Sequence, residues 1–220
     1  MAKKIIKKRK PSLKLERSLQ NEGHLIIAGV DEAGRGAWAG PVVAAAVVLP
    51  FLNKYYDIND SKMLTENQRE RIVKKIYEIA ADIGVGIVEN EELDSMGVGQ
   101  ATYLAMRRAV NNLSIKPMYI LVDGFRVGFS GIPSRGILDG DKKSVSIAAA
   151  SIVAKVSRDR IMRSIHEDDS KYGFDTNKGY GTAYHHAQMK KLGLNEWHRK
   201  SFKPVREVFV NKSSLKISSK

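Results

Sequence analysis

The sequence contains no cysteine among its 220 residues, which excludes disulfide bonds and thiolate metal sites. It also has no apolar run near the roughly 20 residues that a membrane-spanning helix needs. The first ten residues, MAKKIIKKRK, lack the long apolar stretch of a signal peptide. We therefore expect a cytoplasmic protein with no membrane partner. The hydrophobic fraction of 43% suffices for one domain with an appendage, or for two small domains.

Acidic side chains are missing from the beginning of the chain and scarce at its end. Residues 1–14 carry seven basic side chains and no acidic one, and residues 190–220 carry nine basic and two acidic ones. The middle, residues 15–189, is therefore close to neutral although the whole chain carries +13. Basic ends of this kind bind polyanions, largely through release of counterions, although the first end also fits a solubilising tail. Aromatic and histidine side chains within residues 190–206 favour polyanion binding there.

The order of apolar and amphipathic segments predicts a mixed α/β or α+β domain that is followed by a helical appendage. Short apolar runs predict buried strands at residues 25–30, 42–49, 83–88 and 118–122. Helical patterns cover residues 65–80, 100–113, 144–166, 183–192 and 204–210. Thr65 and Gln68 form a capping box at the start of the first of these helices.

Carboxylates follow two of the predicted strands directly. Asp31 and Glu32 come after the strand at 25–30, and Asp123 comes after the strand at 118–122. The ends of buried strands are frequent positions for catalytic or metal-binding groups, although Asp and Gly also occur there in ordinary turns. Adjacent strand residues point to opposite faces, so both acids of the first pair can serve one site only if the chain bends, which the glycines of the following Gly-Arg-Gly sequence permit.

A further acid lies on the apolar stripe of the long helix predicted at 144–166. Asp159 follows Ile152 by seven residues and Val156 by three, so all three share one face. A buried carboxylate needs a cation or hydrogen-bond donors nearby. A salt bridge to Arg163, fraying of the helix, or a metal ion shared with the strand-end acids would each satisfy it. Asp141, in a turn-rich segment, is a rival acid.

Four acids, namely Asp31, Glu32, Asp123 and Asp159, could thus converge on one site. An all-oxygen site of this type suits Mg²⁺ or Mn²⁺ rather than Zn²⁺. Two such ions about 4 Å apart stabilise the attacking and leaving oxygens of an in-line phosphoryl displacement. The basic ends would then hold a phosphate-rich substrate.

Six short motifs in register over residues 25–206 resemble those of type 2 ribonuclease H, the bacterial ribonuclease HII. They are GVDEAGRG (29–36), NDSKML (59–64), LVDG (121–124), AASIVAKVSRDR (149–160), NKGYGT (177–182) and HRKSF (198–202). The resemblance implies an α/β fold of the ribonuclease H type, a mixed sheet flanked by helices with a helical C-terminal extension. We expect a flexible basic arm over 1–20, the catalytic domain over 21–182, a substrate-binding extension over 183–210 and a flexible tail over 211–220.

The activity that the resemblance implies is endonucleolytic hydrolysis on the 5′ side of a ribonucleotide. The substrates would be RNA–DNA hybrids and duplex DNA with embedded ribonucleotides, and the products would carry 3′-hydroxyl and 5′-phosphate ends. Two Mg²⁺ or Mn²⁺ ions would be held by Asp31, Glu32, Asp123 and Asp159. Asp159 is preferred to Asp141 because the resemblance places the fourth acid in the SRD stretch. Such an enzyme, which we expect to be monomeric, serves ribonucleotide removal and RNA primer removal in DNA repair and replication.

Substrate contacts follow from the same resemblance. The family reads the ribose 2′-hydroxyl through a Gly-Arg-Gly backbone and a tyrosine, here Gly34, Arg35, Gly36 and Tyr180. The 2′-hydroxyl is what distinguishes RNA from DNA at one nucleotide. Candidate phosphate contacts, which position a duplex without specifying its sequence, are Lys62, Lys155, His185 and Arg199. The alternative functions are a non-catalytic nucleic-acid-binding protein and another ribonuclease H-like nuclease such as a junction resolvase.

Overall fold

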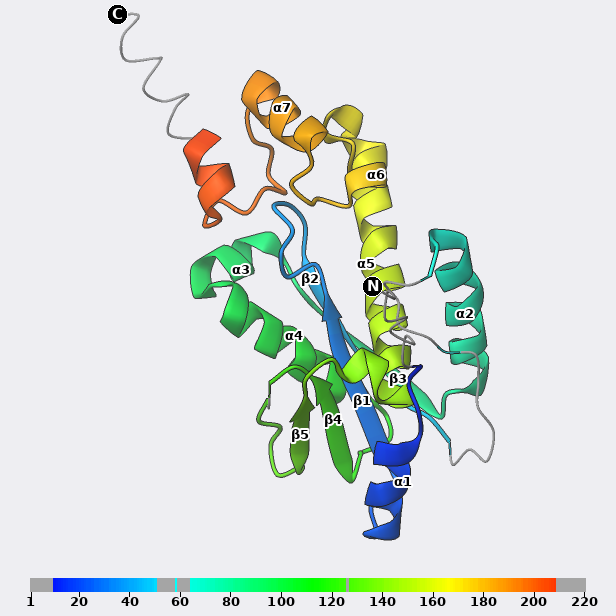
Figure 1. The fold of residues 1–220 in the computed structure, drawn as a ribbon. Helices are drawn as coiled ribbons and strands as arrows, with labels where there is room; N and C mark the ends of the chain where they lie inside the picture. Colours follow the sequence, from blue (N-terminus) through cyan, green and yellow to red (C-terminus); the bar gives the residue numbers. More distant parts are fainter. Residues whose placement is uncertain (1–9, 51–57, 59–63, 126, 209–220) are drawn as a thin grey trace, which may run out of the picture.

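The protein is described by a computed structural model that covers residues 10–50, 58, 64–125 and 127–208. Its centre is a five-stranded sheet in the order β3-β2-β1-β4-β5 (Figure 1). The strands are β1 (Ile27–Ala33), β2 (Val42–Val48), β3 (Asp82–Val88), β4 (Tyr119–Asp123) and β5 (Ser134–Ile137). β1, β2 and β3 pair antiparallel in sequence order, whereas β1, β4 and β5 run parallel. The mixed sheet that was expected is therefore confirmed.

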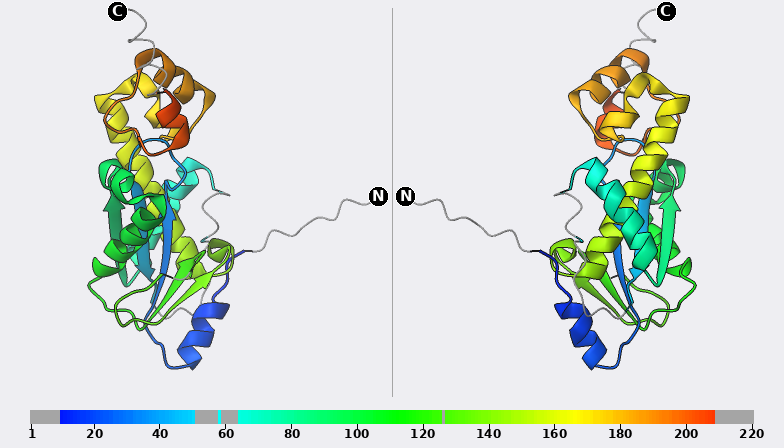
Figure 2. Two further views of the ribbon diagram at one scale, coloured as in Figure 1. Left: turned by 90° about the vertical axis from the view of Figure 1, so that its left-hand side faces the viewer. Right: turned by 90° about the vertical axis from the view of Figure 1, so that its right-hand side faces the viewer.

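Helices cover both faces of this sheet (Figures 1 and 2). They are α1 (Lys14–Asn21), α2 (Glu66–Ile79), α3 (Asn90–Met96), α4 (Val98–Asn111), α5 (Val145–Asp168), α6 (Phe174–Asn177) and α7 (Ala183–Leu192). The short 3₁₀ turns η2 (Gly140–Lys142) and η3 (Ser170–Tyr172) flank α5, and residues 203–208 are again helical. Within the described ranges, no helix is both long enough and apolar enough to cross a membrane.

The two faces of the sheet carry separate apolar cores. Alternate residues of β1 and β2, among them Ala28 and Val30, pack with α4, because successive strand side chains point to opposite faces. The other residues of β2, such as Ala45 and Val47, pack with α2 and α5. A third core joins the end of α5 to the C-terminal helices through Met162, Met189 and their neighbours. The C-terminal extension is thus packed on the helix that runs along the sheet.

Local sequence signals account for most of these elements. Thr65 and Gln68 form both hydrogen bonds of the predicted capping box at the start of α2. Ser144 caps α5 by accepting a hydrogen bond from the backbone N–H of Ile147. One expected strand boundary was wrong. β1 continues through Asp31 and Glu32 to Ala33, because all three pair in register with β2.

Helix α1 includes the last seven residues, 14–20, of the segment 1–20 that was expected to be a flexible basic arm. Its Glu16 is buried, and the Oε1 atom accepts hydrogen bonds from the hydroxyl of Ser144 (2.6 Å) and from the N–H and hydroxyl of Ser146 (3.0 and 2.9 Å). A carboxylate at the N-terminus of α5 also interacts favourably with the helix dipole. These contacts fasten α1 to the start of α5.

We predict that Gly29→Ala destabilises the protein by about 2 kcal/mol or more, since overpacking of a core is costly. A Cβ atom at position 29 would lie 2.1 Å from the backbone carbon of Ser146 in α5, so the helix would have to move. The measurement is urea denaturation. Gly99→Ala in α4 is the matched control, because that position has open space and alanine is the better helix former by about 1 kcal/mol. Equal stabilities of the two variants would contradict the close contact.

Candidate active site

A pocket of about 260 Å³ opens where β1 ends and the following loop begins. It brings together acidic, basic and glycine residues from β1, its following loop, β4, α2, α5 and the segment before α7. The residues that line it are Asp31, Glu32, Ala33, Gly34, Arg35, Gly36, Arg69, Asp123, Ser151, Lys155 and Tyr180. Three of the four predicted acids and all four predicted ribose-reading residues are therefore in one place.

Strand pairing positions the two aspartates of this pocket. β1 and β4 run side by side in parallel, with Val30 opposite Val122. The next residues along the two strands are Asp31 and Asp123, so their carboxylates lie at the same edge of the sheet. Asp31 is buried and its Oδ1 accepts a hydrogen bond from the backbone N–H of Glu32 at 2.7 Å. Register alone therefore produces a pair of neighbouring carboxylates.

The electrostatic environment of Asp31 is unfavourable for its charged form. Burial raises the pKa of Asp31 well above its usual value, and the charges of Glu32 and Asp123 raise it further. Hydrogen bonds from Ser151 of α5 and from the backbone act in the opposite direction. A cation among these acids would relieve both the burial cost and the repulsion. In the described part of the chain, however, no three His, Asp or Glu side chains already converge closely enough to hold one ion.

Asp141 belongs to the turn whose backbone contacts Asp123. The backbone N–H of Gly140 donates to Oδ1 of Asp123 at 2.6 Å, which brings the η2 turn against the end of β4. Asp141 is the following residue and is 1% exposed. The turn-rich segment thus contains a buried acid that directly follows the residue bonded to Asp123.

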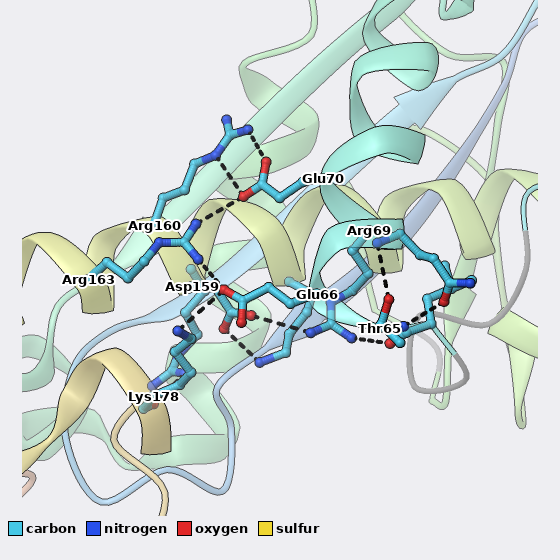
Figure 3. A network of polar contacts seen from close by, with 12 residues as sticks. Thr65, Glu66, Arg69, Glu70, Asp159, Arg160, Arg163 and Lys178 are labelled. Carbon is cyan, nitrogen blue, oxygen red and sulfur yellow. Dashed lines mark hydrogen bonds and ion pairs between the residues drawn. The ribbon is translucent and has the colours of Figure 1, made fainter.

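Asp159 occupies a different environment (Figure 3). It is buried on α5 as the apolar stripe predicted, but its partners are basic side chains, and it does not line the pocket. Its Oδ1 lies 2.6 Å from Nζ of Lys155, and its Oδ2 lies 3.9 Å from a guanidinium nitrogen of Arg69. Arg163, the partner considered from the sequence, instead pairs with Glu66 and Glu70 of α2. An ion pair therefore satisfies this carboxylate.

The loop after β1 and the segment around Tyr180 both contribute to the pocket lining, and the backbone N–H of Trp38 joins them by donating to the carbonyl of Gly179 at 2.8 Å. Gly34 has φ +88°, a conformation that favours glycine. Tyr180 is 37% exposed, and its ring lies 5.4 Å from the guanidinium carbon of Arg158 and 5.7 Å from Nζ of Lys155. An exposed aromatic ring held from one side by cations is available for stacking on a sugar or base.

Two of the expected phosphate contacts were wrong. His185 and Arg199 are completely buried and cannot reach a duplex in this arrangement. The side chain of His185 lies 3.1 Å from that of His198 between their Nε2 atoms, and the guanidinium of Arg199 donates to backbone carbonyls. The basic composition of a segment therefore does not show that each of its basic side chains is exposed. Lys62 lies outside the described residues.

Three contributors to the pocket or its walls were not proposed from the sequence, namely Arg69, Ser151 and Arg158. Arg69 lies on α2. Ser151 lies on α5, where its side chain forms a hydrogen bond with Asp31. Arg158 is buried behind Gly34 and donates to the carbonyl of Ala39 at 3.0 Å. The available signal was an arginine directly before Asp159, at the end of the alanine-rich half of the helix.

Comparison with known proteins agrees with this geometry. The structure of ribonuclease H2 from Pyrococcus horikoshii has the same fold, with a TM-score of 0.73 and 28% identity over 84% of this chain and 98% of that one. The ribonuclease HII of Desulfitobacterium hafniense strain Y51 is 47% identical over 195 residues, which are 89% of this chain and 75% of that protein. That of Syntrophus aciditrophicus is 49% identical over 188 residues, covering 86% and 89%.

The family model for ribonuclease HII matches residues 28–205. The chain therefore belongs to the ribonuclease HII family, which confirms the resemblance. Membership makes it an enzyme, a metal-dependent ribonuclease H, rather than a non-catalytic nucleic-acid-binding protein.

The buried histidine pair predicts a pH dependence of stability. Burial lowers the pKa of both His185 and His198, and for His198, where the charge of His185 adds to burial, to about 4. In the unfolded chain both titrate near pH 6.5. Between about pH 6.5 and 4 the unfolded state binds more protons, so stability is fully present above pH 6.5 and is lost as the pH falls, by at most about 1.4 kcal/mol per pH unit for each proton.

We expect urea denaturation at pH 7.5, 6 and 5 to show this loss, and we expect His198→Gln to lose less between pH 6.5 and 5 than the wild type. Asp31 acts in the opposite direction, because its raised pKa makes the folded state bind more protons. The difference between wild type and variant cancels that contribution. Parallel pH profiles for the two proteins would rule out the histidine pair as the cause.

Proposed function

We propose that this enzyme hydrolyses the phosphodiester on the 5′ side of a ribonucleotide, in RNA–DNA hybrids and in duplex DNA with embedded ribonucleotides. Its products would carry 3′-hydroxyl and 5′-phosphate ends, and its roles would be ribonucleotide removal and RNA primer removal. The observation that carries the proposal is one pocket in which three carboxylates face the Gly34-Arg35-Gly36 loop and Tyr180. A phosphodiester and the adjacent ribose could therefore be bound at the same time.

The donor set fits a pair of Mg²⁺ or Mn²⁺ ions. Asp31, Glu32 and Asp123 offer only oxygen ligands, which these ions prefer. The mutual repulsion and burial of the acids favour a cation among them. When bound, divalent ions would supply charge stabilisation for the attacking and leaving oxygens.

Residues of the chain itself would bind the ribose and the phosphate. The backbone around Gly34 and Gly36 can approach the ribose closely because these residues have no side chain. Tyr180 presents an exposed ring for the neighbouring sugar, and Lys155 and Arg69 line the pocket as positive charges for phosphate oxygens. Recognition of the 2′-hydroxyl would thus depend on backbone and ring positions, while the basic side chains hold the phosphate without regard to sequence.

Asp141 has stronger support than Asp159 as the fourth acid. It is buried on the turn whose backbone binds Asp123, whereas Asp159 forms a close ion pair with Lys155. A carboxylate neutralised by a lysine has less to gain from a metal ion. We therefore place Asp31, Glu32, Asp123 and Asp141 in the metal site, and propose that Asp159 orients Lys155.

The test of the proposed function is cleavage of a duplex that carries one ribonucleotide, with an all-DNA duplex and an RNA–DNA hybrid beside it, in Mg²⁺ and in Mn²⁺. We predict cleavage 5′ of the ribonucleotide and a loss of about 10³-fold or more in kcat for Asp123→Asn. In EDTA the variant should melt no lower than the wild type, because one repelling charge is gone. Glu78→Gln, at an exposed position of α2, is the control for loss of one negative charge.

Absence of cleavage in either metal, with duplex binding retained, would refute the proposed function. Preferential cutting of an all-DNA four-way junction would indicate a resolvase instead.

The fourth acid can be identified by comparing Asp141→Asn with Asp159→Asn. We predict that Asp141→Asn lowers kcat by about 100-fold or more and raises the Mn²⁺ concentration for half-maximal rate. Asp159→Asn should leave that concentration unchanged and should destabilise the fold by about 2 kcal/mol, since it strands Lys155 beside a buried position. A Mn²⁺ requirement that changes in Asp159→Asn and not in Asp141→Asn would restore Asp159 to the site.

A further inference from the structure

Two completely buried arginines hold the loop between β1 and β2, residues 34–41. Arg158 comes from α5, and Arg199 comes from the C-terminal extension. Nε and two terminal nitrogens of each guanidinium donate to backbone carbonyls, which gives six hydrogen bonds of 2.8–3.1 Å. Both side chains share the carbonyl of Pro41, so they lie side by side beneath the loop.

Arg199 fixes the beginning and the end of this loop. It donates to the carbonyl of Arg35 at 3.1 Å, within the Gly-Arg-Gly sequence, and to those of Gly40 (2.8 Å) and Pro41 (2.9 Å). Its own backbone N–H donates to the carbonyl of Trp38 at 2.8 Å. The extension therefore holds the ribose-facing loop by main-chain and side-chain contacts alike.

Arg158 connects the same loop to the segment that carries Tyr180. Its guanidinium donates to the carbonyl of Ala39 at 3.0 Å and to that of Lys178 at 2.8 Å, and it lies 5.4 Å from the ring of Tyr180. A Cβ atom at Gly34 would lie 1.9 Å from its Nε. One side chain thus contacts both parts of the protein that face the sugar.

The chemistry of these bonds requires arginine. A buried charge is costly unless it is fully hydrogen-bonded, and only a guanidinium offers N–H groups in a fixed fork that can reach three carbonyls in one plane. Burial lowers the pKa of both side chains, and for Arg199, where the charge of Arg158 adds to burial, to about 9. Both keep their charge at neutral pH because a guanidinium is not deprotonated in proteins. The six hydrogen bonds offset the cost of burying these charges.

We propose that Arg158 and Arg199 are positioning residues for ribonucleotide specificity, which hold the Gly34-Arg35-Gly36 backbone and Tyr180 in fixed positions relative to each other. This inference rests on the proposed function, since it names what determines that function's selectivity. Neither side chain would touch the substrate. A small displacement of either wall would weaken recognition of the 2′-hydroxyl while leaving phosphate contacts in place, and misplacements of about 1 Å can cost 100-fold in a precise site.

The experiment compares Arg199→Lys and Arg158→Lys, each in the Asp123→Asn background so that the duplex is not cut. The dissociation constant is measured in Mg²⁺ for a duplex with one ribonucleotide and for the all-DNA duplex of the same sequence. We expect the preference for the ribonucleotide to fall by about tenfold or more in both variants, with all-DNA binding unchanged within about twofold. Arg206→Lys, on the exposed surface of the extension, should keep the preference.

Lysine keeps the positive charge but lacks the forked N–H groups of the guanidinium. A folded lysine variant that keeps the full preference for the ribonucleotide duplex would therefore overturn the proposal. Binding is measured at 10 °C after circular dichroism has verified folding, and if only one of the two variants folds, that variant decides. Equal weakening toward both duplexes would also overturn it, since that outcome indicates a merely structural role.

Hydrogen exchange supplies a readout that does not depend on the substrate. In Arg199→Lys the amides of Trp38, Ala39 and Gly40, which are bonded to the carbonyls of Gly179 and Trp197, should exchange faster while those of β1 and β2 do not. Unchanged exchange would refute the positioning role. If the wild type shows no preference for the ribonucleotide, the proposed function fails, and the exchange result still decides whether the arginines hold the loop.

Discussion

The close contact between α5 and β1 is the constraint on which the rest of the structure depends. The helix can lie directly on the strand only because Gly29 has no side chain where the backbone of Ser146 passes. Its N-terminus is fastened there by Glu16 of α1. From that start the helix runs along the sheet to the pocket, where Ser151 faces Asp31 and Lys155 faces Tyr180. A shift at the start of α5 would move every group that it contributes to the pocket.

The charged side chains in and around the pocket fall into three groups, which differ in the partners that surround them. Asp31, Glu32 and Asp123 repel one another, and together they create a demand for a cation. Asp159 is matched by Lys155, and the buried guanidiniums of Arg158 and Arg199 are matched by backbone carbonyls. The acids that repel one another are therefore the ones that line the pocket, which is where a metal-dependent enzyme uses them.

Features that depend on local sequence patterns were predicted correctly. Predictions that depend on which residues the fold pairs or buries were wrong. The capping box at Thr65, the start of α5 and the strand-end acids follow from spacing and residue type, and the structure has them. The extent of β1 depends on pairing with β2, a contact between distant residues that no local pattern encodes. Likewise, Arg199 and His185 look like surface groups of a basic segment, because charge in a sequence does not reveal which residues the fold encloses.

The position of Arg199 also changes how the C-terminal extension is understood. An appendage that only binds phosphates would present its basic side chains to solvent, but this one directs a buried guanidinium into the loop beside the carboxylates. Trp197 accepts a hydrogen bond from Gly40 at the same place, so the connection is not confined to one side chain. The loop at residues 34–41 follows Asp31 and Glu32 and contributes Gly34, Arg35 and Gly36 to the pocket. A displacement of the extension would therefore also displace this part of the pocket lining. The extension therefore belongs to the architecture of the site itself, and removing it would alter the geometry around Gly34 as well as any contact with a duplex.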